Sequence, residues 1–80
     1  MDEKERAEKD IKKLDAHIKL FKELKLHEKY SEVFDWVTNY FNDSKHFFSK
    51  KDYYSAFGAA NYAYGMLDAI LIFEGKKDDS

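Results

Sequence analysis

Apolar residues recur at helical spacing in three stretches of this chain, and each stretch predicts a helix. In the first stretch they lie three and four residues apart, which places them on one stripe of a helix running from about Asp2 to Lys25. The stripe comprises Ala7, Ile11, Leu14, Ile18 and Phe21. The residues before Ala7 are polar, so we expect the first turns to project into solvent.

The second stretch predicts a helix that ends near Ser49. Its face is continuous along the helical stripe and comprises Tyr30, Val33, Phe34, Val37, Tyr40, Phe41, Ser44, Phe47 and Phe48. Ser31 is a candidate N-cap, because its hydroxyl can accept a hydrogen bond from an early backbone N–H. A start near His27 fits the pattern equally well.

The third stretch predicts a helix from Asp52 to about Glu74. Asp52 is a suitable N-cap, and Gly75 suits the position just after the helix end. The connection from Ser49 to Asp52 is short, so the second and third helices should form an antiparallel hairpin.

Together these elements predict a single all-α domain over residues 1–75, followed by a disordered tail over 76–80. The expected architecture is a three-helix antiparallel bundle whose helix 2–helix 3 hairpin is the rigid part. Since the 80 residues include no Pro and only 3 Gly, helix should exceed roughly 70% of the chain. One core is expected to contain Phe34, Val37, Phe41, Phe57, Ala60, Tyr64 and Leu67.

Composition narrows the classes of function. A net charge of -2 disfavours a nucleic acid as partner, and the absence of Cys excludes disulfides, a thiolate zinc site and a Cys nucleophile. The longest purely apolar run, Ala69 to Phe73, is far shorter than the roughly 20 residues of a membrane span. No signal peptide is recognisable at the start, so we expect a cytoplasmic protein with no membrane partner.

The third helix is unusually rich in small residues. One line along it repeats at steps of four and three and comprises Tyr54, Gly58, Asn61, Gly65, Asp68 and Ile72. Two interpretations stay open. The glycines could let the first helix cross closely, with Asn61 and Asp68 hydrogen-bonded to backbone ends or solvent. Alternatively the line is a contact surface for a second copy or another protein. In a dimer, each Asp68 should pair with Asn61 or a Lys rather than with its symmetry mate.

The sequence gives little support to a catalytic or a metal-binding role. Asp43 and His46 lie three residues apart, as in half of a helical carboxylate–histidine site, but no second set of ligands has matching spacing. We therefore expect no metal and no cofactor, and we predict that the protein is not an enzyme. An enzyme or metal protein built on Asp43, His46, Asn61 and Asp68 remains an alternative. Another is an RNA- or nucleotide-associated protein, for which 6 Tyr, 7 Phe and scattered lysines give weak support.

The stretch from Tyr40 to Ile70 resembles a small archaeal family, numbered 357 among the domains of unknown function. The matching residues are Lys50, Asp52, Tyr53, Ala56, Phe57, Ala60, Tyr62, Ala63, Gly65, Leu67, Asp68 and Ala69. Lys51 departs from the family, which tends to have glycine there, and a left-handed Lys would cost about 1 kcal/mol. The resemblance implies an all-helical fold and a cytoplasmic setting without an assigned activity. The leading hypothesis is a non-enzymatic protein-interaction or self-associating domain, with the protein itself or another protein as partner.

Overall fold

The structure is a computed structural model that describes residues 2–76, and all of the regular secondary structure in that range is helical. Its helices are α1 (Glu3–Glu23), α2 (Leu26–Lys29), α3 (Ser31–Ser49) and α4 (Tyr53–Phe73). Helix accounts for 87% of the structure, and no strand occurs within residues 2–76. The all-α class and the high helix content are confirmed. The one helix beyond the three predicted is α2, a single turn that the sequence patterns did not separate from α3.

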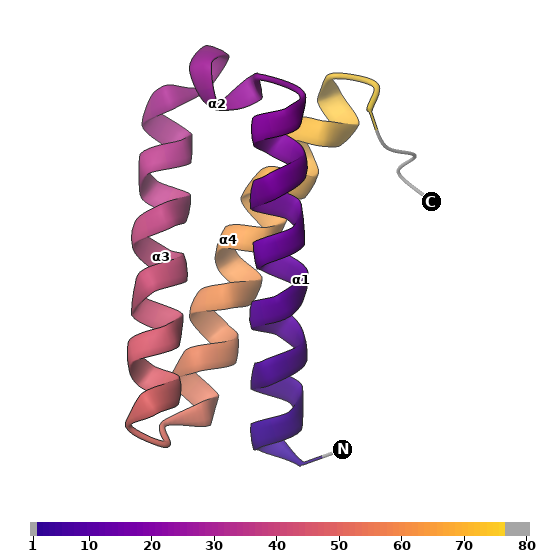
Figure 1. The fold of residues 1–80 in the computed structure, drawn as a ribbon. Coiled ribbons are helices and arrows are strands. Elements are labelled where there is room, and N and C mark those ends of the chain that lie inside the picture. Colours follow the sequence, from indigo (N-terminus) through magenta and orange to yellow (C-terminus); the bar gives the residue numbers. More distant parts are fainter. Residues whose placement is uncertain (1, 77–80) are drawn as a thin grey trace.

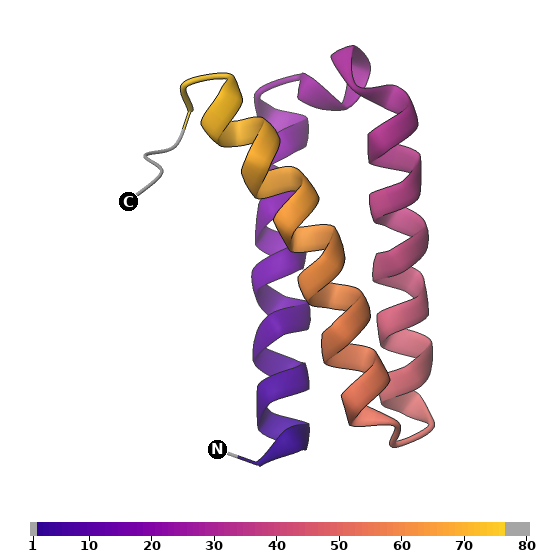
Figure 2. The ribbon, with the colours of Figure 1, turned by 180° about the vertical axis from the view of Figure 1, so that it is seen from behind.

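The chain runs along α1, turns through α2, returns along α3 and runs back along α4 (Figure 1). Seen from behind, α4 crosses diagonally over the other two long helices (Figure 2). It contacts both α1 and α3 extensively, whereas α1 and α3 touch each other much less. The fold is therefore a flat two-layer arrangement of 35 × 26 × 16 Å, in which α4 joins the other helices.

Side-chain caps begin two of the long helices. The Asp2 carboxylate accepts from the Glu5 amide at 2.8 Å, and the Asp52 carboxylate accepts from the Ser55 amide at 3.2 Å. The prediction that Asp52 caps the last helix is confirmed. The Asp2 cap makes α1 helical from Glu3 onward, although its residues before Ala7 are exposed.

The predicted cap at Ser31 is wrong, because Ser31 is already the first residue of α3. The N-cap position belongs to Tyr30, whose side chain makes no capping hydrogen bond. The Tyr30 amide donates to the Leu26 carbonyl at 2.9 Å, and the Tyr30 carbonyl accepts from the Phe34 amide at 2.9 Å. Tyr30 thus makes the last backbone hydrogen bond of α2 and the first of α3, and it is the single residue between the two helices.

The ends of α3 and α4 use the same C-terminal motif with different residues. After α3, Lys51 has φ 65°, its amide donates to the Phe48 carbonyl, and the next amide donates to the Phe47 carbonyl. After α4, Gly75 has φ 70° and the same pair of hydrogen bonds. This is the Schellman motif, in which glycine avoids the steric cost of the left-handed conformation. Gly75 is therefore at the predicted position, and Lys51 carries the expected strain.

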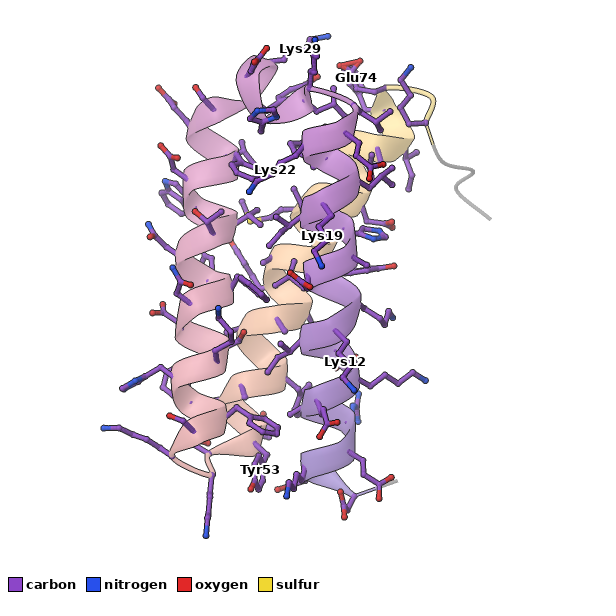
Figure 3. All side chains as sticks on the ribbon, viewed as in Figure 1. Lys12, Lys19, Lys22, Lys29, Tyr53 and Glu74 are labelled. Atoms are coloured by element: carbon purple, nitrogen blue, oxygen red, sulfur yellow. The ribbon has the colours of Figure 1, made fainter. Side chains whose placement is uncertain are left out.

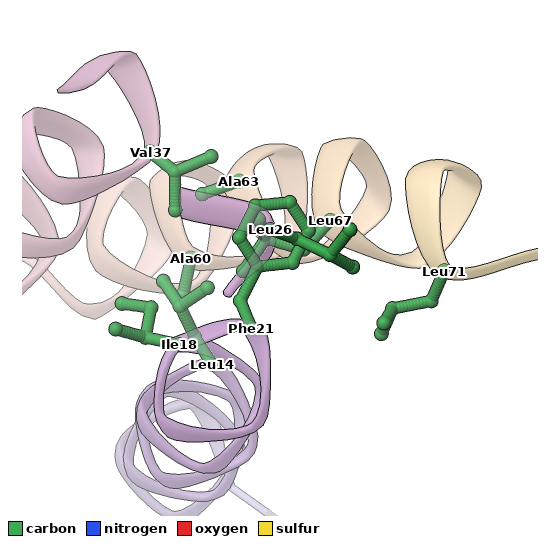
Figure 4. Close-up of a cluster of buried hydrophobic side chains, with 9 residues drawn as sticks. All are labelled: Leu14, Ile18, Phe21, Leu26, Val37, Ala60, Ala63, Leu67 and Leu71. Carbon is green, nitrogen blue, oxygen red and sulfur yellow. The ribbon is translucent and has the colours of Figure 1, made fainter. Parts of the chain in front are cut away.

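The buried cluster lies between α1 and α4 and is closed on one side by α3 (Figure 4). Its members are Leu14, Ile18, Phe21, Leu26, Val37, Ala60, Ala63, Leu67 and Leu71. Of the predicted core, Val37, Ala60 and Leu67 are fully buried. The half-buried residues Phe34, Phe41 and Tyr64 pack against this cluster.

Phe57 does not belong to this cluster, so its assignment to the core is wrong. Its ring is only half-buried, and the Arg6 guanidinium carbon lies 4.5 Å from the ring centroid. The reason is the position of α1, which supplies much of the core and reaches Phe57 only with its exposed first turns. Of the predicted tail over 76–80, residues 77–80 lie outside the described residues.

Candidate functional site

One side of α4 is exposed to solvent, and it is called the outer face here. It comprises Tyr54, Gly58, Asn61, Tyr62, Gly65, Ala69 and Phe73. Its aromatic rings are largely open to solvent, with Tyr54 71%, Tyr62 56% and Phe73 82% exposed. Four residues of the predicted contact line lie on this face, while Asp68 and Ile72 are half-buried at its edge.

Neither glycine on the outer face is needed for helix packing. A Cβ atom added at Gly58 or at Gly65 would meet nothing within 4 Å. The interpretation that these glycines let the first helix cross closely is therefore wrong. The small residues on the packed side of α4 are alanines instead, and Ala56, Ala60 and Ala63 are completely buried.

Asn61 and Asp68 both contact α1. The Asn61 amide donates to the Asp10 carboxylate at 2.8 Å, and an Asp68 oxygen lies 3.5 Å from His17 Nε2. The His17 ring also stacks on Tyr64, with the ring centroids 4.3 Å apart. Within one chain both polar residues therefore contact side chains of α1, and the pairing of Asp68 expected for a dimer stays a prediction. Their contacts fix the position of α1 along α4.

The outer face carries no charge. Asp68 is the single charged residue between Tyr53 and Phe73, and it is held at the α1 edge. Exposed apolar patches on small proteins mark interaction sites, which makes the outer face a candidate for one. Sequence analysis missed Tyr62, Ala69 and Phe73 as members of this face. Their signal was their helical phase, since all three project on the same side of the helix as Gly58.

By length and composition alone, α4 could also cross a membrane. The sequence analysis counted only uninterrupted apolar runs and so did not find this property. The same test is passed by the core helix of a soluble protein, and the inner side of α4 is packed against α1 and α3. The property therefore adds little weight to a membrane role.

The predicted alternative site on α3 has no further ligands. Asp43 and His46 are both exposed. In the part of the chain from 2 to 76, no three His, Cys, Asp or Glu side chains are grouped closely enough to hold a metal ion.

A polar cluster at the far end of α4 shifts three pKa values. Glu74 Oε1 accepts from Lys29 Nζ at 2.6 Å, and Figure 3 labels both residues at the same end of the molecule. Glu74 Oε1 also accepts from the Tyr30 hydroxyl at 2.9 Å. These hydrogen bonds lower the pKa of Glu74. Burial, and then the bond to Glu74, raises the pKa of Tyr30, and the bond to Glu74 raises the pKa of Lys29. The cluster ties the α2 region to the end of α4, and sequence spacing gave no sign of it.

Comparison with known protein families gives one match for the sequence of this chain. The sequence model of a family described as "Protein of unknown function (DUF357)" matches residues 5–74. The chain belongs to the DUF357 family. The match confirms the resemblance found in the sequence and extends it to α1, which had shown little likeness to the family. No curated protein and no solved structure matches the chain. Membership of DUF357 thus identifies relatives without assigning an activity.

Proposed function

We propose that this DUF357 protein is a non-enzymatic interaction domain that forms a homodimer through the outer face of α4. In this proposal the three long helices act as an antiparallel bundle, with the α3–α4 hairpin as its rigid part. The observation that carries it is the open space at Gly58 and Gly65, on an uncharged and exposed helix face.

The two glycines have a cost that the single chain does not recover. A glycine inside a helix destabilises it by roughly 0.5–1 kcal/mol relative to alanine. At Gly58 and at Gly65 no atom of the same chain lies within 4 Å of the position that a Cβ atom would take. Within the single chain, no close packing contact therefore compensates for this cost. A second helix that approaches closely over these positions would supply one, with Tyr54 and Tyr62 filling its flanks.

The pattern of large and small residues also suits a second copy. In an antiparallel pair whose two-fold axis passes between Asn61 and Tyr62, Gly58 lies opposite the partner's Gly65. The same register sets Tyr54 opposite the partner's Ala69, so that a large ring meets a small side chain. An interface around a two-fold axis must complement itself in this way.

A cytoplasmic location is part of the same proposal. The contacts of Asn61 with Asp10 and of Asp68 with His17 favour a helix that packs on α1 in water. A membrane-spanning α4 would break these contacts or carry them into lipid, which is costly for charged groups.

The RNA- or nucleotide-binding alternative has less support, because α4 contains no Lys or Arg beside its exposed rings.

The test is the mass of the protein in solution, measured by light scattering at tens of micromolar. We expect a dimer for the unmodified chain and a monomer for Gly65→Leu, because the added side chain would wedge the two helices apart. The matched control is Asn42→Leu, which adds a leucine at an exposed position of α3 and should leave the dimer intact. Circular dichroism should show the same helix content in all three proteins. A strictly monomeric unmodified chain would contradict the proposal.

A further inference from the structure

A second exposed line runs along α3. Glu32, Trp36, Asn39 and Asp43 recur at steps of four, three and four, and all are exposed. We call this line the α3 stripe. Trp36 is 58% exposed, which is a large apolar area for a monomer to leave in water.

Two shallow depressions flank Trp36 along the α3 stripe. One, of about 210 Å³, is lined by Glu32, Val33, Trp36 and Met66. The other, of about 230 Å³, is lined by Trp36, Asn39, Tyr40 and Asp43. Each depression therefore combines the tryptophan with one carboxylate. The ring of Tyr40 packs against the ring of Tyr62 from α4, with the ring centroids 4.9 Å apart.

The charge of this surface is one-sided. From Tyr30 to Ser44 the chain has three acidic residues and no Lys or Arg. Within residues 2–76, neither Glu32 nor Asp43 forms an ion pair. Lysines are concentrated on α1 instead, where Figure 3 labels Lys12, Lys19 and Lys22.

We propose that the α3 stripe binds a basic segment of a partner protein, with one cationic side chain in each depression and an apolar side chain against Trp36. Each Lys or Arg of that segment meets a carboxylate and an aromatic ring, and both attract a cation. Nucleic acids and anionic lipids do not fit this surface, because their phosphates would face carboxylates. This binding does not depend on self-association through α4.

Helix geometry sets the spacing of the two cations. Glu32 and Asp43 are eleven residues apart, which corresponds to roughly 16 Å along a helix. An extended segment covers that distance in about five residues, at roughly 3.3 Å each. A suitable probe is therefore a six-residue peptide with a lysine at each end and four residues between them, one of which is leucine. Its termini are blocked so that the lysine side chains carry its only charges.

Trp36 is the one tryptophan of the chain, so its fluorescence reports on this surface directly. We expect the lysine peptide to change that fluorescence in a saturable manner, and added salt to weaken the binding. The same peptide with glutamates in place of the lysines should give no saturable change.

The double variant Glu32→Gln/Asp43→Asn should weaken binding of the lysine peptide about fivefold, since exposed charge pairs contribute modestly. The matched control is Asp35→Asn. It removes one charge from an exposed position of α3 that lines neither depression, and it should change the affinity by about twofold at most. Thermal unfolding should confirm that all variants remain folded.

Three outcomes would overturn the inference: no saturable response to the lysine peptide, equal binding of the glutamate peptide, or equal weakening by Asp35→Asn. The last result would mean that overall charge, and not the α3 stripe, attracts the peptide.

Discussion

The inner and outer faces of α4 both combine small and large uncharged side chains but have opposite environments. The inner face comprises Ala56, Ala60, Ala63, Leu67 and Leu71, all with 0% exposure. The outer face also combines small and large side chains, yet Tyr54 and Phe73 are more than two-thirds exposed.

The comparison shows that a small residue in a helix has no fixed role. On the inner face alanine lets α1 and α3 come close, and every added atom would meet a neighbour. On the outer face glycine leaves open space, and an added atom would meet nothing within 4 Å. Variants of the two faces test this difference, and variants at the two ends of α4 test the local geometry there, from the largest expected effect to the smallest.

The largest difference should come from truncating a large side chain on each face. Leu67→Ala should reduce the free energy of unfolding by about 2–5 kcal/mol, because it opens a cavity in the core. Phe73→Ala removes an 82% exposed ring and should change it by about 0.5 kcal/mol or less. Urea unfolding at protein concentrations that keep the chain monomeric measures both. Equal costs would mean that the two faces do not differ as described.

Adding volume should also separate the faces. Ala60→Leu should destabilise the monomer by about 1–3 kcal/mol, because the site is fully packed. Gly65→Leu introduces the same side chain at a position where an added Cβ atom meets nothing within 4 Å, and it should not destabilise the monomer. A thermal melt of each variant at low concentration makes the comparison. A strong loss of stability in Gly65→Leu would show that the outer face is packed after all.

In the turn before α4, the left-handed backbone at Lys51 is one that glycine would adopt more easily. Lys51→Gly should raise the free energy of unfolding by about 0.5–1 kcal/mol, since it relieves a left-handed φ of 65°. The gain is limited because glycine also increases the entropy of the unfolded chain. Lys50→Gly, at a neighbouring position with φ -91°, is the control and should not stabilise. A destabilised Lys51→Gly variant would contradict the Schellman geometry described for this turn.

Conversely, Gly58→Ala should raise the free energy of unfolding of the monomer by roughly 0.5–1 kcal/mol. The position is helical and its added Cβ atom meets nothing within 4 Å. Chemical denaturation of the monomer measures the gain. A loss of stability in the monomer would contradict the open space described at Gly58.

The smallest effect concerns pH at the end of α4. Hydrogen bonds from Lys29 and Tyr30 lower the pKa of Glu74 below its unfolded-state value of about 4.3. Its carboxylate therefore contributes stability above that value, and the contribution is lost as the pH falls through the folded-state pKa. Glu74→Gln should thus be less stable than the unmodified chain at neutral pH, and the difference should shrink in acid. A difference that is constant from neutral pH to pH 3 would rule out the ionised Glu74 as its cause.

Helical periodicity determined much of the fold. The apolar stripes located the three long helices to within a few residues, and Asp52 and Gly75 marked the ends of α4 because capping depends on local backbone geometry. The strained turn at Lys51 was anticipated from the family resemblance instead, because the family tends to have glycine at that position. Local reasoning failed at Ser31, because α3 begins one residue earlier than a Ser31 cap implies and the N-cap position belongs to Tyr30.

Tertiary structure alone decided which side of α4 is covered. Periodicity defines the faces of a helix but does not say where a neighbouring helix lies when most of the circumference is apolar or small. The angle at which α1 crosses α4 buries Ala60, leaves Gly58 and Gly65 in open space, and brings Asn61 to Asp10. These contacts join residues about fifty positions apart, and they depend on how all the helices fill space together. The sequence thus specified the candidate residues, and the packing of α1 and α3 determined which of them face outward.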